Sequence, residues 1–143
     1  MQQKLILCQG LPASGKSTWS KQYCIDNQNY LRINKDDIRD FFSGIPYSSE
    51  FEKRIIELER LYADIIISQG KSLIVDDTNL KQDYIDYWKN FACEHELSFE
   101  IKHFNTSVEE CIARDISREK SVGKDEIIGM YEKYRETYNL KDI

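Results

Sequence analysis

A short glycine-rich segment near the start of the chain has the composition of a phosphate-binding loop. Residues 10–19 read GLPASGKSTW and follow the apolar run LILCQ. They match G-x-x-x-x-G-K-[ST], in which the glycines let successive backbone N–H groups converge on phosphate oxygens. Lys16 would place its charge against the β- and γ-phosphates of ATP, and Ser17 would offer a hydroxyl to Mg²⁺. Phosphate contacts are predicted for Gly10, Pro12, Ala13, Ser14, Gly15, Lys16, Ser17 and Thr18.

A second group of chemically active side chains lies in the segment INKDDIRDF. Asp36 and Arg39 are three residues apart there, so a helix would place them on one face. The second strand of a fold that begins with this loop lies near the first, so that face is expected beside the phosphates. A carboxylate in this place could take a proton from an attacking hydroxyl. The spacing is equally compatible with Asp36 acting only as a helix cap.

A third motif, LIVDDTNL, is an apolar run that ends in two aspartates. A strand-end aspartate beside a phosphate loop organises Mg²⁺ and its waters in phosphoryl-transfer enzymes. Asp76 and Asp77 are both candidates for this role, together with Ser17. The motif therefore predicts a metal site in which one of the two aspartates takes part.

Two arginines, Arg114 and Arg118, are four residues apart at the end of a predicted helix that runs into the polar segment REKSVGK. Arginines on a mobile lid can neutralise charge on a phosphoryl group during its transfer. The alternative is an exposed helix on which Arg114 pairs with Glu110 and takes no part in chemistry. A lid is predicted at about residues 114–124.

Apolar strands alternate with helices along the chain. Strands are predicted at 4–9, 30–34, 72–76 and 97–104, and helices at 16–27, 36–42, 49–68, 81–94, 107–117 and 125–139. This alternation favours a parallel sheet with right-handed crossovers, with the ligand at the carboxyl ends of the strands. The expected fold is α/β, of the P-loop NTPase and kinase type. It has three layers, a central parallel sheet of about four strands flanked by helices, a helical lid, and a single domain over residues 1–143.

Two helices carry apolar stripes that predict how they pack. On the helix at 49–68, residues at spacings of three and four are expected to face the core, namely Ile55, Leu58, Leu61, Tyr62, Ile65 and Ile66. On the last helix, Tyr131, Tyr134 and Tyr138 are also helically spaced. They are interpreted as a core-facing stripe in preference to a platform for stacking bases.

Composition limits the class of protein. The chain has 143 residues, with 41% hydrophobic and 31% charged residues, as expected for one globular domain. The net charge of −5 argues against a basic face that coats long nucleic acid, but a few local cations would suffice to grip a strand end. No apolar run approaches the ~20 residues of a membrane span, and the N-terminus lacks the features of a signal peptide. Four cysteines without a C-x-x-C pair favour reduced thiols, and a cytoplasmic location is expected.

Taken together, the motifs resemble the kinase domain of the phage-type polynucleotide 5′-hydroxyl kinases. The segments GLPASGKSTW, INKDDIRDF, VDDTNL and ARDISREKSVGKDEIIGMYEKYRE occur in a similar order and spacing, and the likeness spans nearly the whole chain. The phosphate loop is shared by many families, whereas the combination of all four segments is far more specific. The resemblance implies ATP and Mg²⁺ as cofactors and a DNA or RNA 5′-hydroxyl end as the phosphate acceptor.

The resemblance also implies roles for the charged residues. Asp36 would be the general base on the 5′-hydroxyl, and Arg39 would hold the phosphate on the 3′ side of that nucleoside. Arg114 and Arg118 match the two lid arginines that contact ATP phosphates. Catalytic roles are thus expected for Asp36, Lys16, Arg114 and Arg118.

At the third motif, Asp77 matches the strand-end aspartate of the family, and Thr78 and Asn79 would face the same site as substrate-binding residues. The chain also departs from the family here. The family often has arginine in place of Lys35 and a serine-like residue in place of Asp76. These differences leave the choice between Asp76 and Asp77 open.

Two further departures concern the lid and the domain content. Gly123 stands where a proline usually follows valine, which would loosen the lid. The D-x-D-x-[TV] motif of the 3′-phosphatase domain does not occur in the sequence, so a kinase without that activity is expected.

Two other functions fit the same residues. A small-molecule kinase acting on a nucleoside or a sugar-type alcohol would use the same loop, and the acidic charge and short length favour it slightly. A non-catalytic nucleotide-binding module would need no general base. The pairing of Asp36 with Arg39 favours the polynucleotide kinase.

Overall fold

Four parallel strands form the centre of the molecule. The computed structural model describes residues 2–143 and contains β1 (Lys4–Gly10), β2 (Tyr30–Ile33), β3 (Ser72–Asp76) and β4 (Ser98–Phe104), in the order β2-β3-β1-β4. β1 is buried from Leu5 to Gly10, as expected for a strand that is covered on both faces. Its parallel register with β3 places Cys8 opposite Asp76. The phosphate loop and the third motif therefore begin side by side at the same edge of the sheet.

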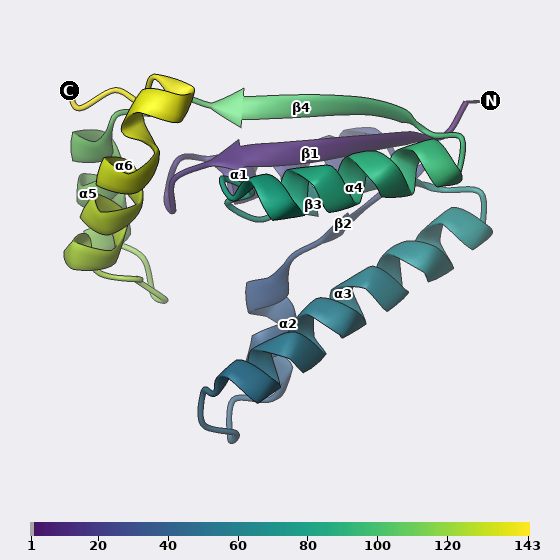
Figure 1. Cartoon of the computed structure of the whole chain (residues 1–143), viewed down its shortest axis with the longest axis horizontal. Helices are drawn as coiled ribbons and strands as arrows, with labels where there is room; N and C mark the ends of the chain where they lie inside the picture. The colour runs from purple at the N-terminus through teal and green to yellow at the C-terminus, as the bar shows by residue number, and fades with distance from the viewer. Residues whose placement is uncertain (1) are drawn as a thin grey trace.

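Six helices cover this sheet and its carboxyl edge. α1 (Lys16–Asp26) lies on one face, α3 (Ser49–Ser68) and α4 (Gln82–Glu94) lie on the other, and α2 (Lys35–Phe41) follows β2 (Figure 1). α5 (Val108–Ile116) and α6 (Lys124–Tyr138) pack together beyond the ends of β1 and β4 (Figure 1). All predicted elements are confirmed to within about one residue at each end, and so is the three-layer α/β fold.

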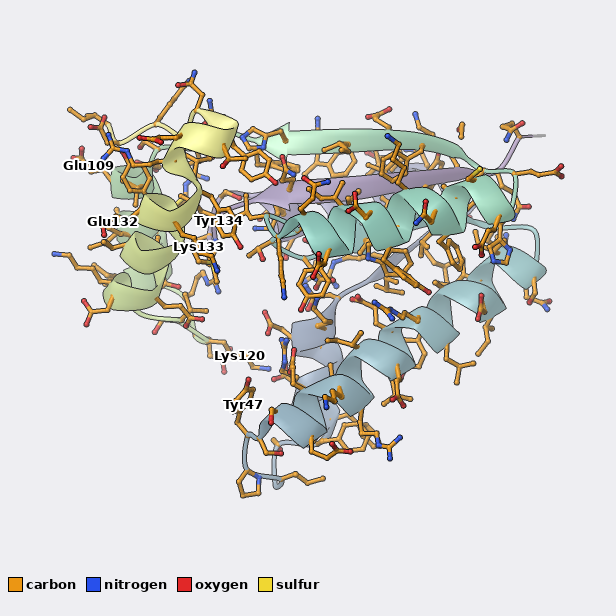
Figure 2. All side chains as sticks on the ribbon, viewed as in Figure 1. Tyr47, Glu109, Lys120, Glu132, Lys133 and Tyr134 are labelled. Carbon is orange, nitrogen blue, oxygen red and sulfur yellow. The ribbon has the colours of Figure 1, made fainter. Side chains whose placement is uncertain are left out.

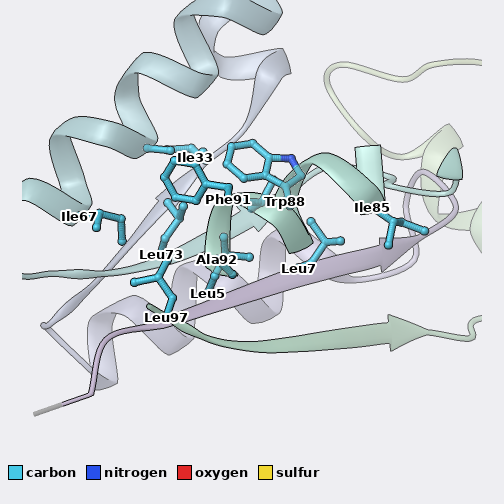
Figure 3. Packing of buried hydrophobic residues seen from close by; sticks show 12 residues of the cluster. Leu5, Leu7, Ile33, Ile67, Leu73, Ile85, Trp88, Phe91, Ala92 and Leu97 are labelled. Carbon is cyan, nitrogen blue, oxygen red and sulfur yellow. The ribbon is translucent and has the colours of Figure 1, made fainter. Parts of the chain in front are cut away.

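The hydrophobic core has one part on each face of the sheet, because side chains alternate along the strands. Leu5 and Leu7 of β1 face α3 and α4, where they join Trp88 and Phe91 (Figure 3). Ile6 on the same strand packs on the opposite side, in a smaller cluster below α1. Successive side chains of a strand point to opposite faces, so one apolar strand supplies both layers. Among residues 2–143, no helix has the length and apolar character needed to cross a membrane.

The packing of α3 differs from the sequence prediction. Its buried positions are Ile55, Glu59, Ala63 and Ile67, four residues apart, whereas Leu61, Tyr62 and Ile65 are exposed. The predicted apolar stripe is therefore wrong for about half of its members. Glu59 occupies one of the buried positions, so the face of α3 that packs inward is not its most apolar face.

The last helix is also only partly as predicted. Tyr131 is buried in the cluster between α5 and α6, in agreement with a core stripe. Tyr134 and Tyr138 are half-buried and lie at the margin of that cluster. The Tyr138 hydroxyl donates to the Leu80 carbonyl oxygen at 2.6 Å, which ties the end of α6 to the loop after β3.

Gly10 is required by close packing at the start of the phosphate loop. A Cβ at this position would lie 2.7 Å from Ser14 Oγ and 2.9 Å from the Phe104 carbonyl oxygen. Neither the loop nor the backbone of β4 can withdraw without disturbing the sheet. By contrast, a Cβ at Gly129 of α6 would meet nothing within 4 Å.

We predict that Gly10→Ala lowers the free energy of unfolding by about 1–3 kcal/mol, because the added methyl group overpacks the loop. Gly129→Ala should raise it by about 0.5–1 kcal/mol, because alanine loses less backbone entropy in a helix. Urea unfolding followed by circular dichroism measures both. Equal effects of the two substitutions would show that the contact at Gly10 is not tight.

Candidate active site

A cleft of about 1330 Å³ opens at the carboxyl edge of the sheet, bounded by the phosphate loop, α2, the loop after α5, and α6. It brings together residues from all four motifs. The predicted site residues that line it are Pro12, Ala13, Gly15, Lys16, Ser17, Thr18, Asp36, Arg39, Asp76, Asp77, Thr78, Arg114 and Arg118. Segments separated by up to about a hundred residues in the chain therefore converge on one cavity.

The phosphate loop encloses its own lysine. Gly15 adopts a left-handed φ of 102° at the start of α1, which turns the chain into the helix. Lys16 is buried and its Nζ donates to the carbonyl oxygens of Gly10 at 3.1 Å and Leu11 at 2.7 Å. Burial lowers the pKa of Lys16, and the charge of Asp76 acts in the opposite direction. Its ammonium group is thus held inside the loop, where it can bind an anion.

Gly10 and Ser14 support the loop from behind and do not line the cleft. Ser14 is buried, and its carbonyl oxygen accepts a hydrogen bond from Thr106 Oγ1 at 2.8 Å. The phosphate contacts expected of these two residues stay a prediction. Both residues shape the loop because they fill the space between it and the segment after β4.

Asp76, the last residue of β3, is a fully buried carboxylate. One of its oxygens, Oδ2, accepts from Arg32 Nε at 2.6 Å and from Ser20 Oγ at 2.9 Å. The same guanidinium donates to Asp37 at 2.6 Å and reaches Ser17 Oγ at 3.4 Å. Arg32 was not singled out from the sequence, because it lies in the middle of β2 without a motif around it. It joins the phosphate loop, the end of β3 and α2.

Asp77 occupies a different environment, one residue further on. Its Oδ1 accepts from the Lys35 backbone N–H at 2.9 Å. Its Oδ2 is buried without a hydrogen-bond partner and lies 3.8 Å from Lys35 Nζ. Glu59 of α3 is also buried, and one of its oxygens lacks a partner as well. Burial, followed by the charge of Asp77, raises the pKa of Glu59 well above its usual range. A proton kept on Glu59 would supply the donor that Asp77 lacks.

The two aspartates have different surroundings. Asp76 is linked to Ser17 through Arg32, and its Oδ1 is buried without a hydrogen-bond partner. A magnesium ion bound with nucleotide phosphates needs only one or two protein oxygens, and it keeps several waters. Ser17 and Asp76 fit that requirement. Asp77 instead orients the start of α2 through the Lys35 N–H.

Asp36 and Arg39 meet on α2 as predicted. Arg39 Nη1 donates to Asp36 Oδ1 at 2.5 Å, and the Asp36 side chain is 72% exposed toward the cleft. A third residue completes this group, because Arg39 also forms a two-pronged ion pair with Glu52 in the first turn of α3. Sequence reasoning missed Glu52, which lies 13 residues from Arg39. With three N–H groups engaged, two donors of the guanidinium are left for a ligand.

The N-terminus of α2 is held by Asn34. Its side chain accepts from the Asp37 N–H at 2.9 Å and donates to the Asp76 carbonyl oxygen at 2.5 Å. The capping role considered for Asp36 therefore belongs to Asn34, which leaves the Asp36 carboxylate available for other contacts. α2 is thereby fixed to the end of β3.

Thr78 and Asn79 have different positions. Thr78 lines the cleft, whereas the Asn79 side chain is buried and donates to the Cys8 carbonyl oxygen at 2.8 Å. The expectation that Asn79 faces the substrate is wrong. Its backbone takes a left-handed φ of 45°, which directs the side chain under β1, where it holds the loop after β3 to that strand.

The lid is anchored at its base by a buried aspartate. Asp115 accepts from the N–H groups of Val122 and Gly123, each at 3.0 Å, and lies 3.5 Å from Arg118. Gly123 has a φ of 98°. Proline in this place could neither donate that hydrogen bond nor adopt this φ. The expectation that Gly123 loosens the lid is therefore wrong.

The tip of the lid reaches the opposite wall of the cleft. Lys120 forms an ion pair with Asp40 at the end of α2, and Lys120 and Tyr47 of the loop before α3, both labelled in Figure 2, line the cleft. Arg114 contacts Glu110 at 3.1 Å, yet its side chain also lines the cleft. Both lid arginines thus face the same cavity as Lys16.

The fold and the site together define a P-loop phosphotransferase scaffold. The model of the AAA_33 family, described as an AAA domain, matches residues 5–136. Because the match covers most of the sequence, the chain belongs to this family.

Three individual relatives are similar to this chain over most of its length. A protein of Autographa californica nuclear polyhedrosis virus named "Putative bifunctional polynucleotide kinase/RNA ligase" is 25% identical over 154 residues, covering 96% of this chain and 22% of the viral protein. The "L-seryl-tRNA(Sec) kinase" of Methanococcus maripaludis is 28% identical over 151 residues, covering 97% and 57%. The "Bifunctional polynucleotide phosphatase/kinase" of Schizosaccharomyces pombe is 27% identical over 107 residues, covering 75% and 22%. The chain therefore spans less than two thirds of the length of each relative.

Solved structures agree on the fold. A chain in the "Structure of Pnkp1/Rnl/Hen1 complex" is 25% identical, with a TM-score of 0.73 over 85% of this chain and 42% of its own length. Another, in the "Structure of the Pnkp1/Rnl/Hen1 RNA repair complex", is 24% identical with a TM-score of 0.84, over 96% and 46%. The resemblance to polynucleotide kinases indicated by the motifs is confirmed by these relatives.

We predict that Arg32→Met lowers the free energy of unfolding by about 3–5 kcal/mol, because it leaves the buried Asp76 carboxylate without its cation. Asp76→Asn combined with Arg32→Met should cost less than the sum of the two single substitutions. Urea unfolding of the four proteins in the cycle measures the coupling. The exposed Arg54, which pairs only with Glu50 and Glu57 on the surface of α3, provides the control, and Arg54→Met should change stability by less than about 1 kcal/mol.

Proposed function

We propose that this chain transfers the γ-phosphate of ATP to the 5′-hydroxyl of a nucleic-acid strand or of a 3′-nucleotide, in the cytoplasm and with Mg²⁺. The observation that carries this proposal is the pair of Asp36 and Arg39 in the same cleft as Lys16 and the lid arginines. A base beside a cation suits an acceptor that carries a hydroxyl and a nearby phosphate. The polynucleotide kinases among the relatives support the same reaction.

On the donor side, the chain supplies positive charge around the phosphates. Lys16 and the loop N–H groups would bind the β- and γ-phosphates, in place of the carbonyl contacts that Lys16 makes now. Arg114 and Arg118 would contact the same phosphates from the lid. Fixed charges of this kind stabilise the phosphoryl group as its charge is redistributed during transfer.

Ser17 and Asp76 would hold Mg²⁺, since both line the cleft and Asp76 Oδ1 is buried without a hydrogen-bond partner. When bound, the ion would neutralise charge on the β- and γ-phosphate oxygens. We assign Asp77 to a structural role, because it receives the Lys35 N–H and adjoins Glu59. The two candidates left open by the sequence thereby receive separate functions.

On the acceptor side, Asp36 would accept the proton of the 5′-hydroxyl while that oxygen forms its bond to the γ-phosphorus. The bond between the γ-phosphorus and the β–γ bridging oxygen breaks, and ADP leaves. Arg39 would use its two remaining N–H donors to hold the phosphate on the 3′ side of the nucleoside, and Thr78 lines the same cleft. Glu52 keeps the guanidinium in this orientation.

We predict that the smallest efficient acceptor is a nucleoside 3′-phosphate and that the bare nucleoside is about ten- to a hundredfold poorer, because it lacks one charge-assisted contact. Arg39→Ala should impair the 3′-phosphorylated acceptor strongly and the nucleoside hardly at all, whereas Asp36→Asn should impair both. Transfer of label from γ-labelled ATP measures these efficiencies.

The same measurement tests the two other functions. If nucleosides or sugars are accepted as well as 3′-nucleotides, the chain is a small-molecule kinase. If wild-type protein binds ATP, Asp36→Asn leaves that binding as it is, and neither protein transfers phosphate to any acceptor, the chain is a binding module.

For the lid, we predict that Arg114→Ala and Arg118→Ala lower kcat by about 10³-fold or more with little change in the Kd for ATP, because their contacts strengthen mainly in the transition state. Steady-state kinetics and equilibrium binding of ATP measure the two quantities separately. A raised KM with unchanged kcat would make both arginines ground-state binders and would contradict this role.

A further inference from the structure

A second cavity of about 450 Å³ adjoins the active-site cleft. It lies between the start of α4 and one side of α6, and Thr78, Glu126 and Met130 line both cavities. The residues that belong to it alone include Lys81, Tyr84, Lys133 and Tyr134. We call this cavity the side groove. None of these four residues has a part in the phosphate loop, in α2 or in the lid.

The side groove combines aromatic rings with ammonium groups on both walls. On the α4 side, Lys81 Nζ lies 5.6 Å from the centre of the Tyr84 ring, and Lys35 Nζ lies 4.1 Å from it. On the α6 side, Lys133 Nζ lies 5.4 Å from the centre of the Tyr134 ring. Figure 2 shows Lys133 and Tyr134 on the side of α6 that faces the sheet, whereas Glu132 points away from it. Each wall therefore presents one tyrosine and one exposed lysine.

The lysines of the groove are largely uncompensated. Lys81 lies 3.9 Å from Asp83, at the limit of an ion pair, and Lys133 forms no ion pair within residues 2–143. Among the residues that line the groove, these two lysines stand against a single carboxylate, Glu126. Rings for base stacking beside cations for phosphates are the features with which proteins bind single-stranded nucleic acid. The cavity has the size of a small-ligand site, which suits unpaired nucleotides.

Thr78 connects the cleft with the side groove and so indicates where an acceptor strand would leave the cleft. It lines both cavities, and it lies one residue after Asp77 at the acceptor end of the cleft. A strand whose 5′-hydroxyl is at Asp36 must leave the cleft at some point after its first phosphate. The donor end is closed to it, because the phosphate loop and the lid arginines belong to ATP. The side groove is the continuation of the cleft that carries cations.

We propose that the side groove binds the nucleotides that follow the first nucleoside of a single-stranded acceptor. Lys81 and Lys133 contact their phosphates, and Tyr84 and Tyr134 stack on their bases. This proposal rests on the proposed function, since it extends the same acceptor site. It replaces the purely structural interpretation of Tyr134 and makes the enzyme prefer a strand to a mononucleotide.

Acceptors of different length test the proposal. With wild-type protein, a 5′-hydroxyl trinucleotide should exceed a nucleoside 3′-phosphate in kcat/KM by about tenfold or more, because stacking and phosphate contacts are added. The double variant Lys81→Ala/Lys133→Ala should lose that gain and keep the efficiency with the nucleoside 3′-phosphate within about twofold. Its plot of log KM against log salt for the trinucleotide should also be flatter by about 1.4, or ~0.7 for each lost contact.

Controls separate specific contacts from general charge. Lys71→Ala/Lys89→Ala removes the same charge from exposed positions outside both cavities and should leave the length preference intact. Tyr134→Leu keeps apolar bulk against the α5–α6 cluster but removes the ring, and should lower trinucleotide affinity about fivefold or more. Fluorescence anisotropy of a labelled trinucleotide without ATP measures that affinity independently of catalysis.

The outcomes distinguish the two proposals. If the nucleoside 3′-phosphate is phosphorylated and longer strands bring no gain, the side groove is not a strand site, although the proposed function stands. The same conclusion follows if both double variants weaken the trinucleotide equally. If no 5′-hydroxyl acceptor of any length is phosphorylated or bound, the proposed function itself is overturned.

Discussion

The burial of one carboxylate, Asp76, governs how the site is assembled. Its side chain is fully enclosed at the end of β3, and an unpaired charge in such a place would cost several kcal/mol. Compensation comes from Arg32 of β2 and from Ser20 of α1. The pairing of β2 with β3 places Arg32 opposite Ile74, so the guanidinium reaches the end of β3 only in this register. The same charge therefore influences three features, which are the order of the strands, the position of α1 and the position of the phosphate loop.

The next residue, Asp77, extends this arrangement to the acceptor side. Because Asp77 receives the Lys35 N–H and adjoins the buried Glu59, it fixes α2 and α3 relative to the sheet. Asp36 and Arg39 are carried on α2, and Glu52 and Glu59 on α3. The donor and acceptor halves of the site are thus positioned by two consecutive aspartates. A substitution of either aspartate would change the geometry of both the donor half and the acceptor half of the site.

The lid has a firm base and a weakly held tip. Asp115 binds the backbone of Val122 and Gly123, so the loop cannot leave α5 and α6 without exposing a buried carboxylate. At the tip, the ion pair between Lys120 and Asp40 is exposed to solvent, and such pairs contribute little. Opening therefore costs little at the tip, while Arg114 and Arg118 stay at the wall of the cleft. The cleft is less acidic than the chain as a whole, because eight lysines and arginines line it together with seven aspartates and glutamates.

The sequence by itself determined the elements and most of the chemical groups. Strand and helix bounds follow from local apolar periodicity and capping, and the phosphate loop and the Asp36–Arg39 pair are local patterns that survive in any packing. The tertiary structure decided the partners. Arg32 meets Asp76 across 44 residues, and Glu59 turns inward although apolar neighbours on α3 were available. The prediction that Asn79 faces the substrate was wrong for the same reason, since its side chain forms a hydrogen bond with the backbone of β1. Strand order and helix rotation determine which partner each buried charge contacts. Neither can be predicted from the spacing of residues along one segment.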